Sequence, residues 1–525
     1  MEVVEIRDLD GPNLFRLEPV IKIGLKLDAD DDRDAIIEEI NAGINAAHDL
    51  VGEQRPTIST YVFDRLDEPA LVFDWHWRHF AVGAARFALG EDYSADDPAS
   101  REALLARLRD DREARDAPLW VRDAERSVPT VGITGTNGKT TTTRLIAHIA
   151  MRAGRSVGWS SSTGVYLNGK QVLEGDYSGP GGARRVLEEP TLDLAVLETA
   201  RGGLLQRGLA YESNDISVFL NVTADHLSLH GIDTVETLAR VKGVVVRVTR
   251  PQGLVVLNAD DPLVLAFRDR VKAPVVLISQ SPASEAVQQH IARAGKAIVR
   301  EGDEIAHHCD GQRSVIARVA DIPIAFGGAA PFMVENAMAA SGAALGLGFS
   351  LAQVADGLTS FRSDSTSNKG RLNVFDVGGC AAVIDYAHND VGLLSLAKFS
   401  NSLIKSAGGK LHLIVGTAGD RRDEDFLALG RIARQQAQRI YLKDTPGYLR
   451  GRGAGEMLAL MQRGFDQARG SGALAGAFED ECAAFIAALD AALPGDVIAV
   501  MCQADQDRMI DEIVQRGGRE WASSA

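Results

Sequence analysis

The segment from Val131 to Thr143, VGITGTNGKTTTT, holds the residue types that bind phosphate. Its two glycines at 135 and 138 let the backbone approach an anion, and the first N–H groups of a following helix point at that anion. The amine of Lys139 has the length to reach the β- and γ-phosphates of a nucleotide, and the hydroxyl of Thr140 can bind Mg²⁺. The segment therefore predicts a nucleotide site.

The secondary-structure elements on either side of this segment determine whether its backbone can bind an anion. Residues 129–134 are a short β-branched run, which predicts a buried strand, and a helix is expected from about Lys139. A strand, a glycine turn and a helix are the arrangement that binds phosphate. Ile133 stands where the strict G-x-x-x-x-G-K-[ST] motif has its first glycine, so an ordinary glycine-rich turn is the alternative. The flanking strand and helix favour the phosphate site.

The bulk composition limits the possible functions. A chain of 525 residues predicts about three domains. The formal net charge of −16 argues against general affinity for nucleic acid or for an anionic membrane. The four cysteines form no C-x-x-C pair, which is typical of reduced thiols. With no signal-like start and no membrane-length apolar run, we expect a cytoplasmic protein.

The predicted fold class is α/β with three domains. Residues 1–126 contain alternating runs, an amphipathic helix near 34–50 and a charged helix near 97–115, which predict a small α+β domain. Strands and helices alternate from 127 to 367, which indicates a doubly wound, mostly parallel sheet around the phosphate loop. A Ser/Thr/Asn-rich stretch at 363–370 has the composition of a linker. Residues 368–525 predict a Rossmann-like α/β domain.

Carboxylates and a histidine follow predicted strands of the central domain. Glu198 ends the strand 192–197, and the pair Asp225–His226 follows the strand 216–222. Ligands of open α/β sheets bind at the carboxyl ends of the strands. Glu198 is thus a candidate Mg²⁺ ligand, against the alternative of a capping residue in a loop.

The last domain repeats this pattern. A hairpin is expected around Gly378-Gly379, and the turn DYAHN follows its second strand. Six consecutive charged residues, Asp420 to Asp425, follow the strand 411–415 and precede a helix. Such a run is by default a solvated loop, but its place at a strand end favours a site.

These segments, taken in order, resemble the Mur ligase family, whose members use ATP to join an amino acid to a carboxylate. The matching strings are TGTNGKTTTT, LETARGGLLQRGL, NVTADHLSLHG, DYAHND and GDRRDED. Within the family the chain is most similar to the cyanophycin synthetases, whose N-terminal domain also begins with a Gly-Pro-Asn segment before a strand. The resemblance extends from about residue 10 to about residue 505.

The resemblance implies ATP and Mg²⁺ as cofactors, with two metal sites. The implied metal ligands are Thr140, Glu198, His226 and Lys242. An unmodified lysine would repel the metal, so this role of Lys242 depends on carbamylation of its amine. The alternative is a lysine on a helix surface. The implied nucleotide contacts are Gly135, Thr136, Asn137, Gly138, Lys139, Thr140, Thr141, Asn336, Arg371 and Asp385.

The resemblance also implies catalytic and substrate-binding residues. The catalytic set is Lys139, Glu198, His226, Lys242, Arg371 and His388, and the substrate set is Arg201, Asp420, Arg421, Arg422 and Asp423. Two departures from the family stand out. Phe332 and Met333 replace the His-Asn that opens the adenine-binding segment, and Asp390 replaces the usual proline after DYAHN.

The expected activity is ATP-dependent amide-bond formation through an acyl-phosphate, with arginine joined to an aspartyl side chain as in cyanophycin synthesis. Cyanophycin synthetases carry an ATP-grasp module before their Mur-like module, whereas here the charged helix leads almost directly to the phosphate loop. We therefore expect that the chain does not make the polymer alone by that route, and a separately encoded ATP-grasp synthetase is an expected partner. The alternatives are the same chemistry on another acidic acceptor, or a non-catalytic nucleotide-binding partner of a polymer synthetase. A homo-oligomer is also implied by the resemblance.

Overall fold

The computed structural model describes residues 1–91, 98–229, 231–404 and 408–521. The chain forms two compact units, which are described separately. The first comprises Met1–Gly135, Ala153–Val222 and Ser228–Val276, and the second comprises Thr136–Arg152, Thr223–Leu227 and Leu277–Ala525. Within the described ranges, none of the helices combines the length and the apolar character needed to cross a bilayer.

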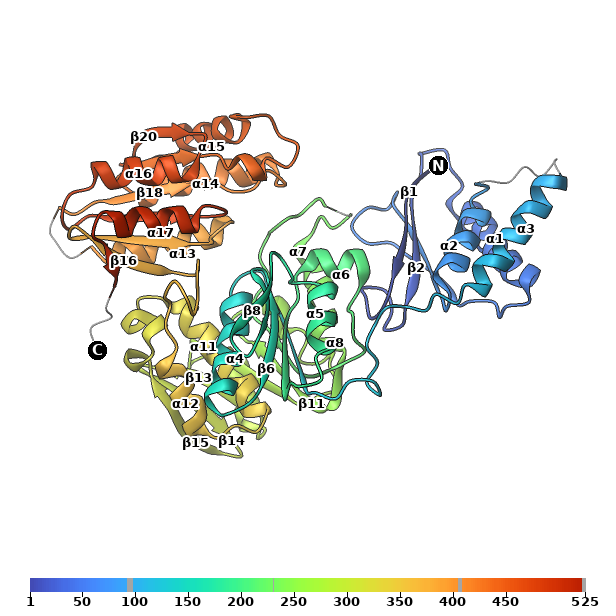
Figure 1. Cartoon of the computed structure of the whole chain (residues 1–525), viewed down its shortest axis with the longest axis horizontal. Helices are drawn as coiled ribbons and strands as arrows, with labels where there is room; N and C mark the ends of the chain where they lie inside the picture. The colour runs from blue at the N-terminus through green and yellow to red at the C-terminus, as the bar shows by residue number, and fades with distance from the viewer. Residues whose placement is uncertain (92–97, 230, 405–407, 522–525) are drawn as a thin grey trace. The chain divides into compact units, whose positions relative to one another are not determined.

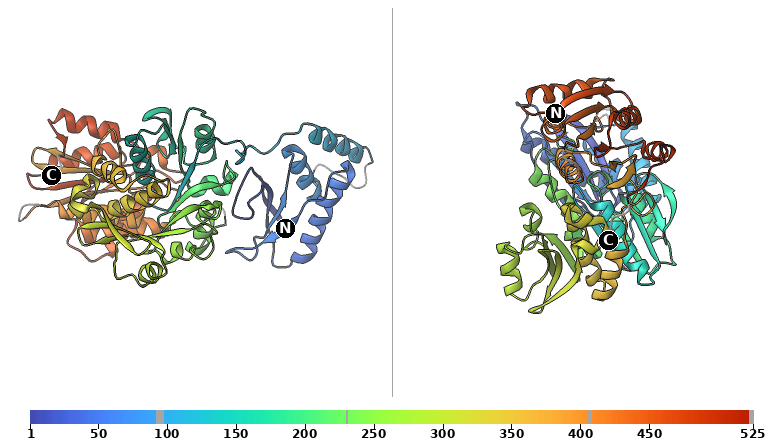
Figure 2. Two further views of the ribbon diagram at one scale, coloured as in Figure 1. Left: turned by 90° about the horizontal axis from the view of Figure 1, so that it is seen from below. Right: turned by 90° about the vertical axis from the view of Figure 1, so that its left-hand side faces the viewer.

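The first unit begins with a four-stranded antiparallel sheet of order β1-β2-β4-β3. Its strands are β1 (Glu2–Leu9), β2 (Val20–Lys26), β3 (Ile58–Tyr61) and β4 (Ala70–Asp74). Helices α1 (Arg33–Val51) and α2 (Arg78–Ala88) cover one face and bury its apolar side chains, and α3 (Pro98–Glu113) packs on both helices (Figures 1 and 2). The two predicted helices are confirmed as α1 and α3, although Asp97 lies outside the described residues.

The rest of the first unit holds a mostly parallel sheet of order β11-β10-β5-β9-β6-β7-β8. Its strands are β5 (Thr130–Thr134), β6 (Val157–Ser161), β7 (Gly164–Leu167), β8 (Lys170–Glu174), β9 (Leu194–Glu198), β10 (Asn214–Phe219) and β11 (Thr249–Asn258). The accompanying helices are α5 (Pro180–Leu187), α6 (Arg201–Arg207), α7 (Val235–Lys242), α8 (Val244–Arg247) and α9 (Pro262–Leu265). Parallel pairing brings the ends of β5 and β9 to one edge, because Ile133 lies opposite Glu198.

The second unit contains the helix that follows the phosphate loop, α4 (Lys139–Arg152). It packs against α11 (Pro331–Gly346) and α12 (Leu351–Ser360) (Figure 1). Three antiparallel strands belong to the same unit: β13 (Lys296–Glu301), β14 (Glu304–Cys309) and β15 (Gln312–Arg318). Strand β12 (Val275–Ser279), helix α10 (Glu285–Ala292) and the 3₁₀ turns at Val319–Asp321 and Pro323–Gly328 complete this region.

The C-terminal part of the second unit is a seven-stranded sheet of order β20-β19-β18-β21-β17-β16-β22. Its strands are β16 (Asn373–Val377), β17 (Cys380–Asp385), β18 (Leu411–Val415), β19 (Arg439–Lys443), β20 (Ala473–Phe478), β21 (Val497–Met501) and β22 (Arg519–Glu520). Its helices are α13 (Asp390–Ser402), α14 (Asp423–Gln436), α15 (Glu456–Gln467), α16 (Glu481–Ala491) and α17 (Gln506–Gln515), with a 3₁₀ turn at Pro446–Tyr448. The sheet is parallel from β17 to β20, and β16 pairs with β17 as the predicted hairpin.

The stretch at 363–370, which has the composition of a linker, is tightly hydrogen-bonded. The amide of Asn373 donates to the carbonyls of Ser363, Asp364 and Asn368. Asn368 is fully buried, and its side chain accepts a 3.2 Å hydrogen bond from Arg144 of α4. The stretch is therefore an ordered connection.

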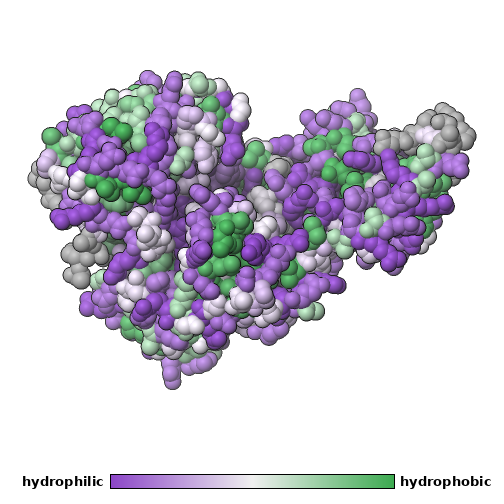
Figure 3. Space-filling view, in the orientation of Figure 1, coloured by the Kyte–Doolittle hydropathy of each residue, from purple (hydrophilic) through white to green (hydrophobic). Residues whose placement is uncertain are grey.

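The surface shown in Figure 3 is mainly hydrophilic, with apolar residues in separate patches. Large apolar side chains that are exposed among the described residues are scattered along the chain, for example Leu66, Leu493 and Val514.

Candidate functional site

In the first unit, the phosphate loop begins where β5 ends. Gly135 follows β5 with a φ of +156°. The buried amine of Lys242, the last residue of α7, donates a 2.9 Å hydrogen bond to the carbonyl of Gly135. Lys242 thus contacts the first residue of the phosphate loop.

Two further predicted residues lie at the carboxyl end of β9. Glu198 is 2% exposed, and its carboxylate accepts a 3.3 Å hydrogen bond from the backbone N–H of Ser162. Arg201 is also buried and opens α6. The N–H of Thr199 bonds the carbonyl of Ile133, which holds this segment beside the end of β5.

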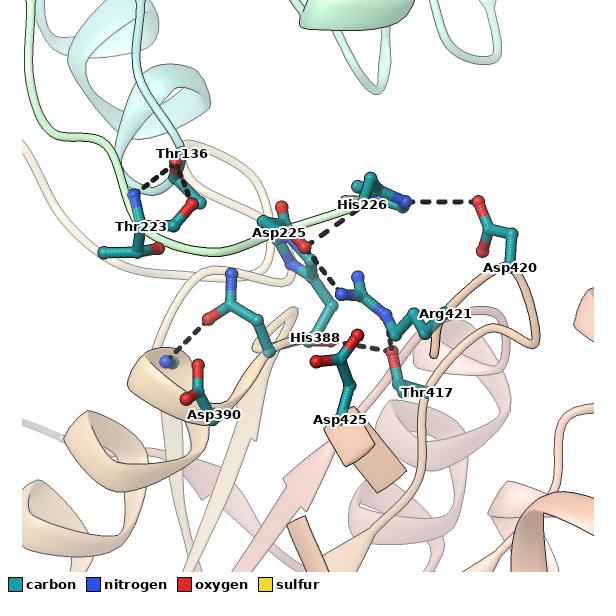
Figure 4. A network of polar contacts seen from close by, with 12 residues as sticks. Thr136, Thr223, Asp225, His226, His388, Asp390, Thr417, Asp420, Arg421 and Asp425 are labelled. Atoms are coloured by element: carbon teal, nitrogen blue, oxygen red, sulfur yellow. Dashed lines mark hydrogen bonds and ion pairs between the residues drawn. The ribbon is translucent and has the colours of Figure 1, made fainter. Parts of the chain in front are cut away.

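In the second unit, α4 begins at Lys139, as predicted. Gly138 has a φ of +88°, which a residue with a side chain would adopt with strain. The amine of Lys139 donates a 2.9 Å hydrogen bond to the carbonyl of Thr136. The hydroxyl of Thr136 in turn accepts a 3.0 Å bond from the backbone N–H of Thr223 (Figure 4).

Arg371 reaches the start of α4. Its guanidinium donates a 3.2 Å hydrogen bond to the hydroxyl of Thr140 and lies 4.3 Å from the centre of the Tyr386 ring. An amide contact of 3.3 Å joins Asn389 to Asn137 nearby. A cation, a hydroxyl and the positive end of a helix therefore meet here, which suits a polyphosphate with its metal.

Asp225 is the centre of a charged cluster in the second unit. Arg421 donates a 2.6 Å hydrogen bond to its carboxylate, and Nε2 of His388 lies 3.4 Å from it (Figure 4). Burial alone would raise the pKa of Asp225, but His388 and the Arg421 charge hold that pKa well below its usual range. Burial lowers the pKa of His388 despite the nearby carboxylate. The hydroxyl of Thr417 accepts from Arg421 and donates to the carbonyl of His388.

His226 forms the second part of this cluster. Its Nδ1 lies 3.2 Å from the carboxylate of Asp420 (Figure 4). The hydrogen bond with His226 lowers the pKa of Asp420 to about 2. His226 has a φ of +52°, a strained conformation for a residue with a side chain. An imidazole held by a carboxylate through one nitrogen is a common arrangement for binding a metal through the other.

The predicted metal ligands are divided between the units. Glu198 and Lys242 belong to the first unit, and Thr140 and His226 belong to the second. Carboxylate and hydroxyl oxygens are donors that suit Mg²⁺. Within the part of the chain that the structure describes, no three His, Cys, Asp or Glu side chains are grouped to hold a metal ion. Mg²⁺ bound by either pair of residues would therefore draw further ligands from nucleotide oxygens and water.

The predicted substrate residues of the charged run have different neighbours. Asp420 and Arg421 point to His226 and Asp225, as described above. Arg422 instead pairs with Asp425 at 2.9 Å. Asp423 accepts a 2.9 Å hydrogen bond from Arg452, whose guanidinium also bonds two carbonyls of the loop. The first two residues thus join the cluster, and Arg422 and Asp423 have partners within the C-terminal part.

Of the other predicted nucleotide contacts, Asp385 is half-buried and Asn336 is buried. The carboxylate of Asp385 accepts a 2.8 Å hydrogen bond from the N–H of Leu372, and burial raises its pKa against the opposing charge of Arg371. Asn336 is 3% exposed in α11, and its amide nitrogen lies 3.7 Å from the sulfur of Met333. Asp385 is therefore close to Arg371, and Asn336 contributes to a buried helix face.

Several residues of this cluster were not predicted as site residues. Asp225 lies in the loop after β10, and Thr417 lies two residues beyond β18. Their positions after the carboxyl ends of strands could have identified both as candidate site residues. The contact of Thr223 with Thr136 involves a backbone N–H, for which the sequence carries no signal.

Comparison with protein-family models gives two matches. Residues 133–344 match the Mur ligase middle domain, and residues 370–503 match the Mur ligase, glutamate ligase domain. Together the two matches include the phosphate loop and the charged cluster.

Curated relatives agree with these matches. The chain is 42% identical over 363 residues to a cyanophycin synthetase of Synechocystis sp., which is 69% of this chain and 41% of that protein. It is 39% identical over 399 residues to the cyanophycin synthetase of Trichormus variabilis, covering 76% of this chain and 44% of that protein. A UDP-N-acetylmuramoyl-L-alanyl-D-glutamate–2,6-diaminopimelate ligase of Geobacillus thermodenitrificans is 25% identical over 359 residues, covering 64% of this chain and 67% of that one. The chain thus spans less than half the length of these cyanophycin synthetases.

Solved structures share the fold. FolC of E. coli in complex with ADP superposes with a TM-score of 0.54 at 18% identity, covering 74% of this chain and 90% of that one. MurF of Acinetobacter baumannii gives 0.53 at 16% identity, covering 79% and 87%. The predicted architecture is confirmed by these likenesses.

Proposed function

The chain belongs to the Mur ligase family, and on this premise we propose that it uses ATP to form an amide bond between a carboxylate and an amino acid. The observation that carries the proposal is the start of α4, where Lys139, Thr140 and the guanidinium of Arg371 come together. A helix N-terminus with two added cations is suited to the charge of a nucleotide polyphosphate.

We assign the nucleotide to the loop of residues 135–141. The backbone N–H groups at the start of α4 would bind its phosphates, and Lys139 would leave its bond with Thr136 to reach them. Thr140, Glu198, His226 and a carbamylated Lys242 would hold Mg²⁺ at two sites. When bound, Mg²⁺ neutralises the charge that develops on the transferred phosphoryl group.

The reaction would have two steps. A carboxylate oxygen of the acceptor attacks the γ-phosphorus, an acyl-phosphate forms and ADP leaves. The amine nitrogen then attacks the acyl carbon, an amide forms, and phosphate and a proton leave. Arg421 or Arg422 would neutralise the negative charge of the acyl-phosphate, and the acidic residues Asp420 and Asp423 would bind a cationic amino acid.

We assign arginine as the amine and an aspartyl side chain of an acidic peptide as the acceptor. The similarity to cyanophycin synthetases supports this assignment. A separate ATP-grasp synthetase would then supply the peptide. We also assign three domains, at 1–126, 127–367 and 368–525.

The alternative is the same chemistry on another acidic acceptor. The relatives include diaminopimelate ligases, which are named for another substrate. A non-catalytic partner of a polymer synthetase is the third possibility. The simultaneous presence of Lys139, Thr140, Glu198, His226 and Asp385 speaks against it.

The test is ADP release by the purified protein with ATP and Mg²⁺. Acidic peptides are compared with and without arginine, and mass spectrometry measures the peptide. One arginine gained per ADP is the expected result, and Lys139→Ala should abolish it. If the wild type and Lys139→Ala release ADP equally, or neither does so with any acceptor, the ligase assignment fails.

A further inference from the structure

In the first unit, two helices lead away from predicted site residues and contact the N-terminal sheet region. Helix α6 begins at Arg201, three residues after Glu198, and α7 ends at Lys242. The two helices lie beside each other (Figure 1). Each of them is bonded to residues that precede position 70.

The contact with α7 centres on the carboxylate of Asp64, which follows β3. One oxygen accepts from the backbone N–H groups of Asp233 and Thr234, at 2.8 and 2.9 Å. The other accepts from the hydroxyls of Thr234 and Thr237, at 2.9 and 2.7 Å. Asp64 therefore satisfies donors at the start of α7, where a helix has unpaired N–H groups.

The next residue, Arg65, strengthens the same contact. Its guanidinium donates two hydrogen bonds to the carboxylate of Asp233, at 2.6 and 3.0 Å, and a third bond to Glu68. A bidentate pair of this kind fixes orientation as well as distance.

The contact with α6 is made by the Gly-Pro-Asn segment. The N–H of Leu209 bonds the carbonyl of Pro12 at 2.7 Å, and the N–H of Asp10 bonds the carbonyl of Arg207 at 2.9 Å. A Cβ on Gly11 would lie 2.2 Å from the carbonyl oxygen of Leu209, so only glycine fits there. The buried side chain of Asn13 shapes the turn by accepting from Phe15 and Arg16.

Helix α7 connects Asp64 to the phosphate loop. Its eight residues span about 12 Å, and Leu238 and Val241 are fully buried along it. At its far end, Lys242 bonds the carbonyl of Gly135. A short helix with a packed apolar face moves as one body, so its starting position determines where its last residue lies.

We propose that Asp64 is a positioning residue for the nucleotide site, because it fixes the start of α7 and thereby the contact of Lys242 with Gly135. The N-terminal domain is then a structural support of the phosphate loop. The consequence for nucleotide binding rests on the proposed function, whereas the support of α7 stands on the contacts alone.

The test uses the full chain with Asp64→Ala, Asp64→Asn and the control Asp67→Ala, which alters an exposed carboxylate of the same loop. Hydrogen–deuterium exchange of residues 235–242 and the affinity for ADP with Mg²⁺ are measured. Asp64→Ala should raise exchange in α7 about tenfold or more and weaken ADP binding by a similar factor. Asp64→Asn, which keeps an acceptor oxygen, should recover part of both, and Asp67→Ala should behave as the wild type.

Unchanged exchange in Asp64→Ala, or faster exchange with unchanged ADP affinity, overturns the proposal. If Asp64→Ala does not fold, Thr237→Val is measured in its place, because it removes one hydrogen-bond donor to Asp64 and keeps the shape of the side chain. Exchange and ADP affinity equal to those of the wild type in Thr237→Val then count against the proposal. Failure of the nucleotide assignment looks different, because the wild type itself would then bind no ADP while the exchange experiment could still be read. Failure of the ligase assignment alone leaves both measurements readable, since neither of them needs turnover.

Discussion

Arg421 donates a 2.6 Å hydrogen bond to Asp225, and this bond joins the segment after β10 to the charged run after β18. Both side chains are almost fully buried, at 3% and 10% exposed. A buried ion pair adds little to the free energy of folding, because each charge has lost its hydration. Its main effect is to hold the two side chains in one geometry. We therefore infer that the ion pair fixes the orientation of the Arg421 side chain.

Asp225→Asn should lower the rate of ligation. The amide keeps a hydrogen-bond acceptor but removes the charge opposite Arg421, so kcat/KM should fall roughly tenfold to a hundredfold. Steady-state kinetics measure the effect, and Asp466→Asn on the exposed face of α15 is the control. Equal kinetics in the two variants would show that the pair has no part in the reaction.

Arg371→Lys should weaken binding of ADP with Mg²⁺ about tenfold, because an ammonium group loses the stacking on Tyr386 and the planar geometry that directs one N–H to Thr140. Calorimetric titration measures the affinity. Lys410→Arg is a matched exchange of the two cationic types elsewhere in the same domain. An Arg371→Lys variant that binds as the wild type would exclude a specific role for the guanidinium.

A buried ion pair in the C-terminal sheet predicts a pH-dependent stability. The amine of Lys443 lies 2.5 Å from Glu481, and both side chains have no exposed surface. Burial alone would raise the pKa of Glu481, but Lys443 and backbone N–H donors lower it from 4.5 to about 2. The folded pKa is the lower one, so the stabilisation is complete above about pH 4.5 and is lost as the pH falls toward 2.

Glu481→Gln should therefore lower the free energy of unfolding at pH 7 by about 3 kcal/mol, because Lys443 stays buried without its counter-charge. Urea unfolding at pH 7 and pH 3 checks this, and the difference from the wild type should shrink at pH 3. The double variant Lys443→Met with Glu481→Gln removes both charges and keeps an acceptor oxygen for the backbone N–H groups of Ala504 and Asp505, so it should recover part of the loss. A difference that is independent of pH would contradict the assigned pKa.

Gly430→Ala should destabilise the packing of α14 on α15. A Cβ at 430 would lie 1.9 Å from the carbonyl oxygen of Met461, so the two helices must separate, at a cost of about 1–3 kcal/mol. Thermal unfolding measures the change. Gly447→Ala is the control, since its Cβ meets no atom within 4 Å; an equal melting temperature for both variants would refute the close approach.

The sequence predicted the parts of the site that follow from one local rule. Hydrophobic periodicity located most elements, and the rule that ligands meet the carboxyl ends of parallel strands made Glu198 and His226 candidates. Asp385 became a candidate only through the resemblance to Mur ligases. The same rule could not say which of six consecutive charges turn toward His226. Asp420 and Arg421 do so, whereas Arg422 and Asp423 have local partners, and only the three-dimensional loop distinguishes them.

Residues joined across long stretches of chain were beyond prediction. The pairs Asp64–Thr237 and Lys443–Glu481 each depend on which strands and helices become neighbours in the fold. Short polar side chains such as Asp64 are common in solvated loops, so their type carries no signal until the partner helix is in place.

The segment 363–370 has the composition at which proteases usually separate domains, but its polar groups are bonded within the protein. The side chain of Asn368 is hydrogen-bonded to Arg144 and Thr141 of α4. The side-chain amide of Asn373 donates to three backbone carbonyls of the segment. A protease needs several residues in an extended, accessible form. Limited digestion should therefore leave residues 363–370 intact. Cleavage there would show that the segment has lost its hydrogen bonds to α4, the helix after the phosphate loop.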